Sequence, residues 1–117
     1  MLKSINNYEL NDNVTVEKLL EIGFKKIDNN ILSYYYNLCD DIDLFLHIHQ
    51  NKNTISFNEN VDVEVIDDSF GQYYQPFYDD KSFEYLNKVI KSYNNKMNEL
   101  TELGILKQKQ KQKKLKK

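Results

Sequence analysis

The chain of 117 residues has no alanine, no arginine and no tryptophan, and it contains one cysteine, one proline and three glycines. The absence of arginine argues against sequence-specific reading of DNA, because bidentate contacts to guanine edges are mostly made by arginine. The lone Cys39 cannot form an internal disulfide bond, which is typical of a protein in a reducing compartment. Alanine is the best helix former, so its absence has no folding rationale and indicates a very AT-rich gene.

Long apolar runs are also missing. No run approaches the ~20 residues that a membrane-spanning helix needs, and the N-terminus lacks the apolar segment of a secretory signal peptide. We therefore expect a cytoplasmic protein without a membrane partner. The length is that of one domain with one core, and nine tyrosines and six phenylalanines make up much of its apolar content.

Charge is divided unevenly along the chain. Residues 1–106 contain all 18 acidic residues and nine lysines, a formal charge of −9, whereas residues 107–117 contain seven lysines and no acid, a charge of +7. This pattern predicts a single acidic domain over residues 1–106 and a disordered Lys/Gln-rich tail over residues 107–117. The tail could bind nucleic acid through phosphate charge, fold back on the acidic domain, contact an acidic partner, or have no role.

Hydrophobic periodicity predicts an α+β fold: a short N-terminal helix, a four- to five-stranded antiparallel sheet, and a long C-terminal helix packed on the sheet. Thr15 is typical of an N-cap and Gly23 of a C′ residue, which places the short helix at residues 16–22. The residues before it, through Asn13, are expected to be irregular. The strands are predicted at residues 24–27, 31–38, 42–48, 54–57 and 61–65.

The long helix is predicted over residues 83–103, with Ser82 as its cap and Gly104 as its stop. Its apolar residues recur at spacings of three and four, which favours packing of one helix face on the sheet. That face contains Phe83, Leu86, Ile90, Tyr93, Met97 and Leu100. Val89 and Leu103 would form a second apolar side that could be left exposed, so both a monomer and a dimer stay open.

The segment between the last predicted strand and the long helix has no periodicity, and it contains the only proline and five aromatic residues. We expect Phe70, Tyr74 and Phe77 to turn inward and close one end of the sheet. An interface is the alternative, because exposed tyrosine and phenylalanine beside a proline provide rigid contact area. For Tyr73 and Tyr78 the interface stays open beside the inward position.

No pattern typical of a catalytic or cofactor site is found. His47, His49 and Asp43 share one face of a predicted strand, which is the beginning of a metal site, but no motif supplies further ligands. Cys39 is followed by carboxylates, which disfavour a reactive thiolate. We therefore expect no enzyme activity, no cofactor and no metal. Turn and capping roles explain the aspartate pairs at 40/41, 67/68 and 79/80.

Carboxylates follow the outer faces of two predicted strands. Asp43 lies on one strand, and Asp62 and Glu64 lie about 6.6 Å apart along another, at a rise of about 3.3 Å per residue. Such a face can compete with phosphates for the basic groove of a nucleic-acid enzyme, or it can simply keep an aromatic-rich domain soluble. The candidate partner-binding residues are Asp43, Asp62, Glu64, Asp67, Asp68, Tyr73, Tyr74 and Tyr78.

The motif G-x-x-Y-x-P-F-Y at residues 71–78, preceded by V-I-D-D at residues 65–68, resembles a motif in small uncharacterised proteins of phages and prophages of low-GC bacteria. The resemblance covers about residues 15–106, including the layout of short helix, strands, loop and long helix. It implies a phage accessory protein in the host cytoplasm, and such proteins often bind and inhibit a host protein, as anti-CRISPR proteins do.

From this resemblance and the acidic charge, the expected partner is a host protein, with a CRISPR effector or another nucleic-acid-handling defence complex as the leading class. Two alternatives stay open. One is an accessory protein that binds nucleic acid through the basic tail with nearby aromatic residues. The other is a small phage assembly protein, which would form an oligomer.

Overall fold

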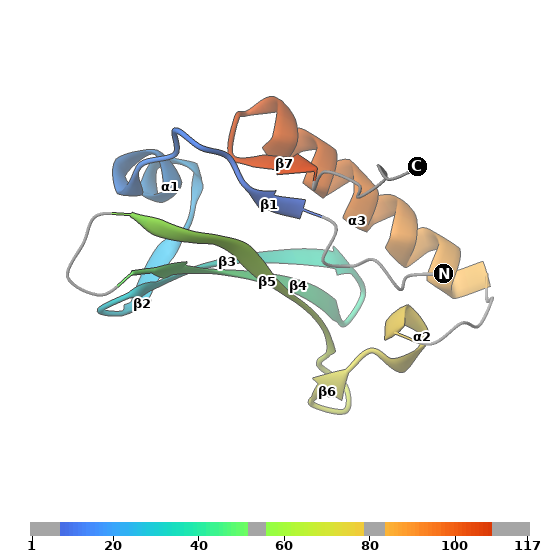
Figure 1. Cartoon of the computed structure of the whole chain (residues 1–117). Coiled ribbons are helices and arrows are strands. Elements are labelled where there is room, and N and C mark those ends of the chain that lie inside the picture. Colours follow the sequence, from blue (N-terminus) through green and yellow to red (C-terminus); the bar gives the residue numbers. More distant parts are fainter. Residues whose placement is uncertain (1–7, 52–55, 79–83, 109–117) are drawn as a thin grey trace, which may run out of the picture.

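The computed structural model of the chain describes residues 8–51, 56–78 and 84–108, which form an α+β fold with a large antiparallel sheet (Figure 1). In chain order the elements are β1 (Tyr8–Leu10), α1 (Val16–Ile22), β2 (Lys25–Asp28), β3 (Ile31–Cys39), β4 (Ile42–Gln50), β5 (Phe57–Asp67), β6 (Gln72–Tyr73), α2 (Gln75–Tyr78), α3 (Glu84–Glu102) and β7 (Leu106–Gln108). Among the described residues, the strand order is β2-β3-β4-β5-β1-β7, with β6 paired to β5.

Helix α1 begins and ends at the residues that the sequence indicates. The Thr15 side chain accepts a hydrogen bond from the backbone N–H of Lys18, which satisfies one of the free donors at the helix start. Gly23 follows the last turn with a φ of 121°, and its N–H donates to carbonyls of that turn. Both predicted caps are confirmed. Burial of Leu19 anchors the helix in the core.

The middle of the sheet is a meander in which β2, β3, β4 and β5 pair in order. Asp40 and Asp41 connect β3 to β4, and Asp40 has a φ of 46°, a conformation that aspartate tolerates better than most residues. Their predicted turn role is therefore confirmed. The registers align Leu46 with Val63 across β4 and β5, so the alternating apolar residues of neighbouring strands share one face.

The predicted break between strands at 54–57 and 61–65 is wrong for the part that the structure describes. Phe57–Asp67 is one continuous strand, while Thr54 and Ile55 lie outside the described residues. The polar residues 58–60 are exposed and interrupt the apolar alternation. They keep the extended backbone, because strand pairing uses backbone groups and not side chains.

The predicted irregular N-terminal segment and the start of the predicted tail also form strands. Glu9 of β1 pairs with Asn60 on one side and with Lys107 of β7 on the other. Tyr8 is buried, and Lys107 Nζ lies 3.0 Å from Asp12 Oδ1. Such three-residue strands are too short to give a periodic signal, so sequence alone did not predict them. Residues 109–117 lie outside the described part of the chain.

Helix α3 packs on the sheet as predicted, but with a wider apolar face. Val89 is fully buried and Ile90 is half-buried, so Val89 does not belong to an exposed second side. Leu103 is exposed, and Ser82 and Phe83 lie outside the described residues. The buried residues of the helix are Leu86, Val89, Tyr93, Lys96, Met97 and Leu100. Of the two residues of the predicted second apolar side, Val89 therefore belongs to the core and only Leu103 is exposed.

One charged residue lies in the contact between α3 and the sheet. The Lys96 ammonium lies 4.2 Å from the centroid of the Tyr36 ring and 2.9 Å from Glu99 Oε1. Burial lowers the pKa of Lys96, but the hydrogen bonds to Glu99 and Tyr34 outweigh it, and the net pKa is raised. Lys96 therefore stays charged, and it is stabilised by a ring face and a carboxylate.

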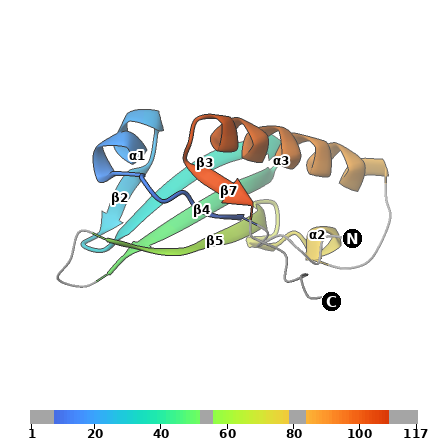
Figure 2. The same cartoon turned by 45° about the horizontal axis from the view of Figure 1, so that its top comes forward.

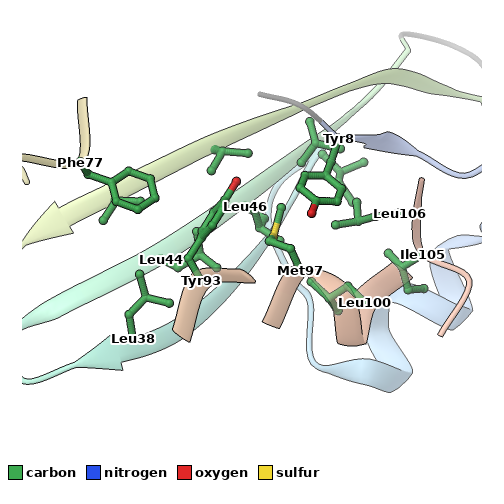
Figure 3. Packing of buried hydrophobic residues seen from close by; sticks show 14 of the residues in the cluster. Tyr8, Leu38, Leu44, Leu46, Phe77, Tyr93, Met97, Leu100, Ile105 and Leu106 are labelled. Carbon is green, nitrogen blue, oxygen red and sulfur yellow. The ribbon is translucent and has the colours of Figure 1, made fainter. Parts of the chain in front are cut away.

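The aromatic segment, which the structure describes over residues 67–78, closes one end of the core with some of its rings. Figure 3 shows Phe77 beside Tyr93, and their ring centroids lie 5.1 Å apart in an edge-on arrangement. Tyr74 and Phe77 are buried, as expected. The inward position predicted for Phe70 is wrong: this side chain is 74% exposed. The backbone N–H groups of Phe70 and Gly71 both donate to the Asp67 carbonyl, and this tight turn points the ring away from the core.

The helices α1 and α3 cover the same face of strands β2–β5 (Figures 1 and 2). Helix α1 contacts β2, and α3 contacts β3 and β7. Among the described residues, no helix covers the opposite face, which we call the open face. None of the described helices is both long and apolar enough to cross a membrane.

Candidate functional site

The open face is built from every second residue of the central strands. Because Leu44, Leu46 and Ile48 point into the core, the intervening residues of β4 point to the open face. The strand registers align these side chains in rows across the sheet. One row is Tyr35, Phe45 and Glu64, and the next is Ser33, His47 and Asp62.

Aromatic rings occupy the part of the open face that lies over β3 and β4. The centroids of the Tyr35 and Phe45 rings are 5.3 Å apart, and the rings of Phe45 and His47 are nearly parallel with centroids 6.4 Å apart. Tyr35 is 56% exposed. Beside these rings lies a hollow of about 370 Å³, lined by Gly23, Lys25, Ile27, Ser33, Tyr35 and Phe45.

Histidines and carboxylates occupy the neighbouring part, over β4 and β5. His47 Nε2 lies 3.3 Å from Glu64 Oε1, and His49 Nε2 lies 2.6 Å from Asp62 Oδ2. The Tyr73 hydroxyl donates to Glu64 Oε2 at 3.1 Å, and this hydrogen bond raises the pKa of Tyr73. Each carboxylate is therefore held in place by at least one neighbour. In the described part of the chain, no group of three or more His, Cys, Asp or Glu residues is arranged to hold a metal ion.

Asp43 also lies on this face, but it is only 2% exposed. Its Oδ1 accepts hydrogen bonds from the Tyr35 hydroxyl at 3.0 Å and from Asn37 Nδ2 at 2.8 Å. The carboxyl group of Asp68 hydrogen-bonds to Asp43, and this contact is the main reason that the pKa of Asp68 is raised to about 6. The expectation that Asp43 presents a free carboxylate to a partner is therefore wrong, because its neighbours cover it.

The other sequence-derived candidates divide into two groups. Asp62, Glu64 and Tyr73 come together on the open face and are accessible, with Tyr73 47% exposed. Tyr74 is buried at 7% exposure, so it contributes to the core and offers no contact area to a partner.

The remaining candidates lie in the turn and helix that follow β5. Asp67 Oδ1 accepts a hydrogen bond from the Ser69 N–H, which confirms its turn role. Asp68 lies on the same turn and contacts Asp43. Tyr78 is the last residue of α2, and Asp79 and Asp80 lie outside the described residues.

Sequence reasoning missed the rings of Tyr35 and Phe45 as candidate contact residues. The alternation of side chains along a strand could have found them. The even-numbered residues of both strands face the core, so Tyr35 and Phe45, at odd positions, must point to the opposite face. Phe70 was missed for a different reason. Its exposure depends on the local turn at Asp67, which the hydrophobic pattern does not report.

A second polar region lies at the end of the sheet, where Asp40, Asp41 and Asp67 border a hollow of about 550 Å³. Hydroxyl groups already donate to its carboxylates: Tyr85 to Asp40 at 2.7 Å and Ser69 to Asp41 at 2.8 Å. Hydrogen bonds to Cys39 and Asp40 raise the pKa of Tyr85. These contacts tie β3, β5 and α3 together, so we interpret this region as structural.

Comparisons with models of protein families, with curated proteins and with solved structures give no match. The function is therefore inferred from the chemistry of the open face.

Proposed function

We propose that the protein is a non-enzymatic binding protein whose open face docks on a basic surface of another protein. The observation that carries this proposal is the combination of exposed rings, at Tyr35 and Tyr73, with the accessible carboxylates of Asp62 and Glu64 on the open face. Aromatic residues dominate the energetic centres of protein interfaces. The strands that carry these side chains are fixed by the core, so little conformational freedom is lost on binding.

The charge of the domain supports a basic partner surface. Residues 1–106 carry a formal charge of −9, which attracts a positively charged surface and speeds its association. Proteins that handle nucleic acid carry such surfaces, because they neutralise phosphates with lysine and arginine. A protein that occupies such a surface excludes the nucleic acid and thereby inhibits its target. In keeping with the phage resemblance, we propose a host protein of this class, such as a CRISPR effector, as the partner.

The test is affinity capture of partners from a bacterial lysate with tagged protein, with and without nuclease, read by mass spectrometry. The variant Asp62→Lys/Glu64→Lys reverses the charge of the open face. Its matched control, Glu21→Lys/Glu102→Lys, makes the same charge change at exposed helix positions. We expect a stoichiometric protein partner that survives nuclease, is lost with the open-face variant and is retained by the control. Equal capture by both variants would overturn the proposal.

The charge of +7 on residues 107–117 favours a second candidate, non-specific binding of nucleic acid. Deletion of residues 109–117 separates the two functions while leaving β7 intact. If the tail carries the function, the deletion abolishes nucleic-acid binding, and capture from the lysate yields only material that nuclease removes. If the open face carries it, the deletion leaves capture of the protein partner unchanged.

A further inference from the structure

One row of the open face combines two aromatic rings with one carboxylate. It crosses the sheet from Tyr35 on β3 through Phe45 on β4 to Glu64 on β5, in direct register. The two rings lie 5.3 Å apart at an angle of 50°. We call these three residues the aromatic–acidic row. Rings beside a carboxylate form a surface that suits a cation with an apolar side chain.

Each member of the row is held in position before any partner binds. The Tyr35 hydroxyl donates to the buried Asp43, which fixes the ring. The Phe45 ring lies parallel to the His47 ring within 2°. Glu64 contacts His47 through Oε1 and the Tyr73 hydroxyl through Oε2. A site whose side chains are already ordered loses less entropy on binding.

Glu64 keeps the capacity to bind a further donor. A carboxylate has about four acceptor positions on its two oxygens, and the described contacts use one on each oxygen. The Glu64 side chain is 37% exposed, so a partner group can reach the remaining positions. Two parallel N–H groups match them best, and that is the geometry of a guanidinium.

We propose that the aromatic–acidic row binds one arginine side chain of the partner protein, with the guanidinium at Glu64 and the side-chain stem across Phe45 and Tyr35. This inference rests on the proposed function and names the chemistry that the open face recognises. Arginine fits better than lysine because its planar, weakly hydrated group stacks on rings and pairs with a carboxylate through two hydrogen bonds. The lysine ammonium is compact and strongly hydrated, so it gains less from a ring face.

The charges around the row set the direction of the bound side chain. Lys25 of β2 lines the hollow beside Tyr35 and Phe45, so a cation is repelled from that end. Asp62 in the next row adds negative charge near Glu64. The guanidinium is therefore favoured over β5, and the apolar stem is favoured over β3 and β4.

The experiment compares two peptide probes of equal charge, hexa-arginine and hexa-lysine, by titration into the full-length protein at one fixed salt concentration. Because the acidic domain attracts both peptides, the measured quantity is the ratio of their dissociation constants. We expect the arginine peptide to bind about fivefold more tightly or better, from a cation–π and bidentate advantage of ordinary size. Equal affinities would overturn the inference.

Three variants test whether the preference for the arginine peptide arises at the aromatic–acidic row. Phe45→Leu keeps apolar bulk but removes a ring face, so it should reduce the ratio while the affinity for hexa-lysine stays the same. Glu64→Gln should reduce the preference for arginine without touching the rings. Phe70→Leu removes another exposed ring outside the row and should leave the ratio unchanged. A preference that survives both Phe45→Leu and Glu64→Gln would contradict the assignment.

The outcomes distinguish this inference from the proposed function. Equal binding of the two peptides, both weakened by Asp62→Lys/Glu64→Lys, would remove the arginine site and leave an acidic docking face. Capture of a protein partner from the lysate depends on the open face as a whole, so it can succeed when the arginine preference fails. Circular dichroism of each variant checks that the fold is retained.

Discussion

Two phenylalanines of the aromatic segment should respond in opposite ways to the same substitution. Phe77 is fully buried and packs edge-on against Tyr93, whereas Phe70 is 74% exposed at the tip of a turn. Phe77→Ala should therefore destabilise the fold strongly, and Phe70→Ala should have almost no effect on stability. Comparison of the two variants isolates the effect of burial, because both substitutions remove a phenylalanine ring from the same segment.

The magnitude for Phe77→Ala follows from its complete burial. Truncation of a buried phenylalanine to alanine costs about 3–5 kcal/mol, from lost apolar transfer and from the cavity that remains. The edge-on contact with Tyr93 is part of that loss. A domain of this size is stable by roughly 5–15 kcal/mol, so Phe77→Ala removes a large share. Phe70→Ala should stay within about 0.5 kcal/mol, as surface changes do.

Urea unfolding followed by far-ultraviolet circular dichroism measures both variants against the unsubstituted protein. With a denaturant slope of about 1–3 kcal/mol per molar, Phe77→Ala should lower the unfolding midpoint by at least about 1 M. Equal midpoint shifts for Phe70→Ala and Phe77→Ala would refute the assignment of one ring to the core and the other to the surface.

Three further predictions concern pH and local backbone. Because the pKa of Asp68 is raised to about 6, the fold retains a proton that the unfolded chain releases above about pH 4, and stability should fall as pH rises from about 4 to 6. In urea unfolding at several pH values, Asp68→Asn should remove this fall. The prediction is contradicted if the free energy of unfolding of Asp68→Asn falls with pH as steeply as that of the unsubstituted protein. Gly23→Ala should destabilise the fold by more than about 1 kcal/mol, since the φ of Gly23 is 121° and a Cβ would lie 3.3 Å from Tyr34 Cε1. An unchanged free energy of unfolding in the same assay would show that alanine fits this position without backbone strain. Thr15→Ala should cost about 1 kcal/mol through loss of the N-cap, and Thr15→Asp should restore it.

The parts of the fold that could be predicted from sequence are those encoded locally. Thr15 and Gly23 bound α1 because caps depend on neighbouring residues. Strand β4 follows from the alternation of Ile42, Leu44, Leu46 and Ile48 with the residues between them, and the turn residues before Ile31 mark the start of β3. Strand β1 could not be predicted, because its pairing with β5 and β7 joins distant parts of the chain.

The candidate site was predicted only in part for a similar reason. Asp62 and Glu64 lie two residues apart on one strand, so the sequence predicts that they share a face, and both are accessible. The burial of Asp43 depends on Tyr35 of a neighbouring strand and on Asp68 of a later turn, and no local pattern reports those contacts. No described helix covers the open face because α1 and α3 both pack on the other face of the sheet.

The central claim is that the open face is the surface that contacts the partner, and chemical footprinting of the captured complex tests it most directly. The two histidines of the chain, His47 and His49, both lie on the open face, so diethyl pyrocarbonate labels this face. Acetylation of Lys88 and Lys91, which are exposed on α3, reports the opposite side of the molecule. We predict that the partner protects both histidines and leaves labelling of both lysines unchanged. Protection of the lysines with unchanged labelling of the histidines would contradict the account.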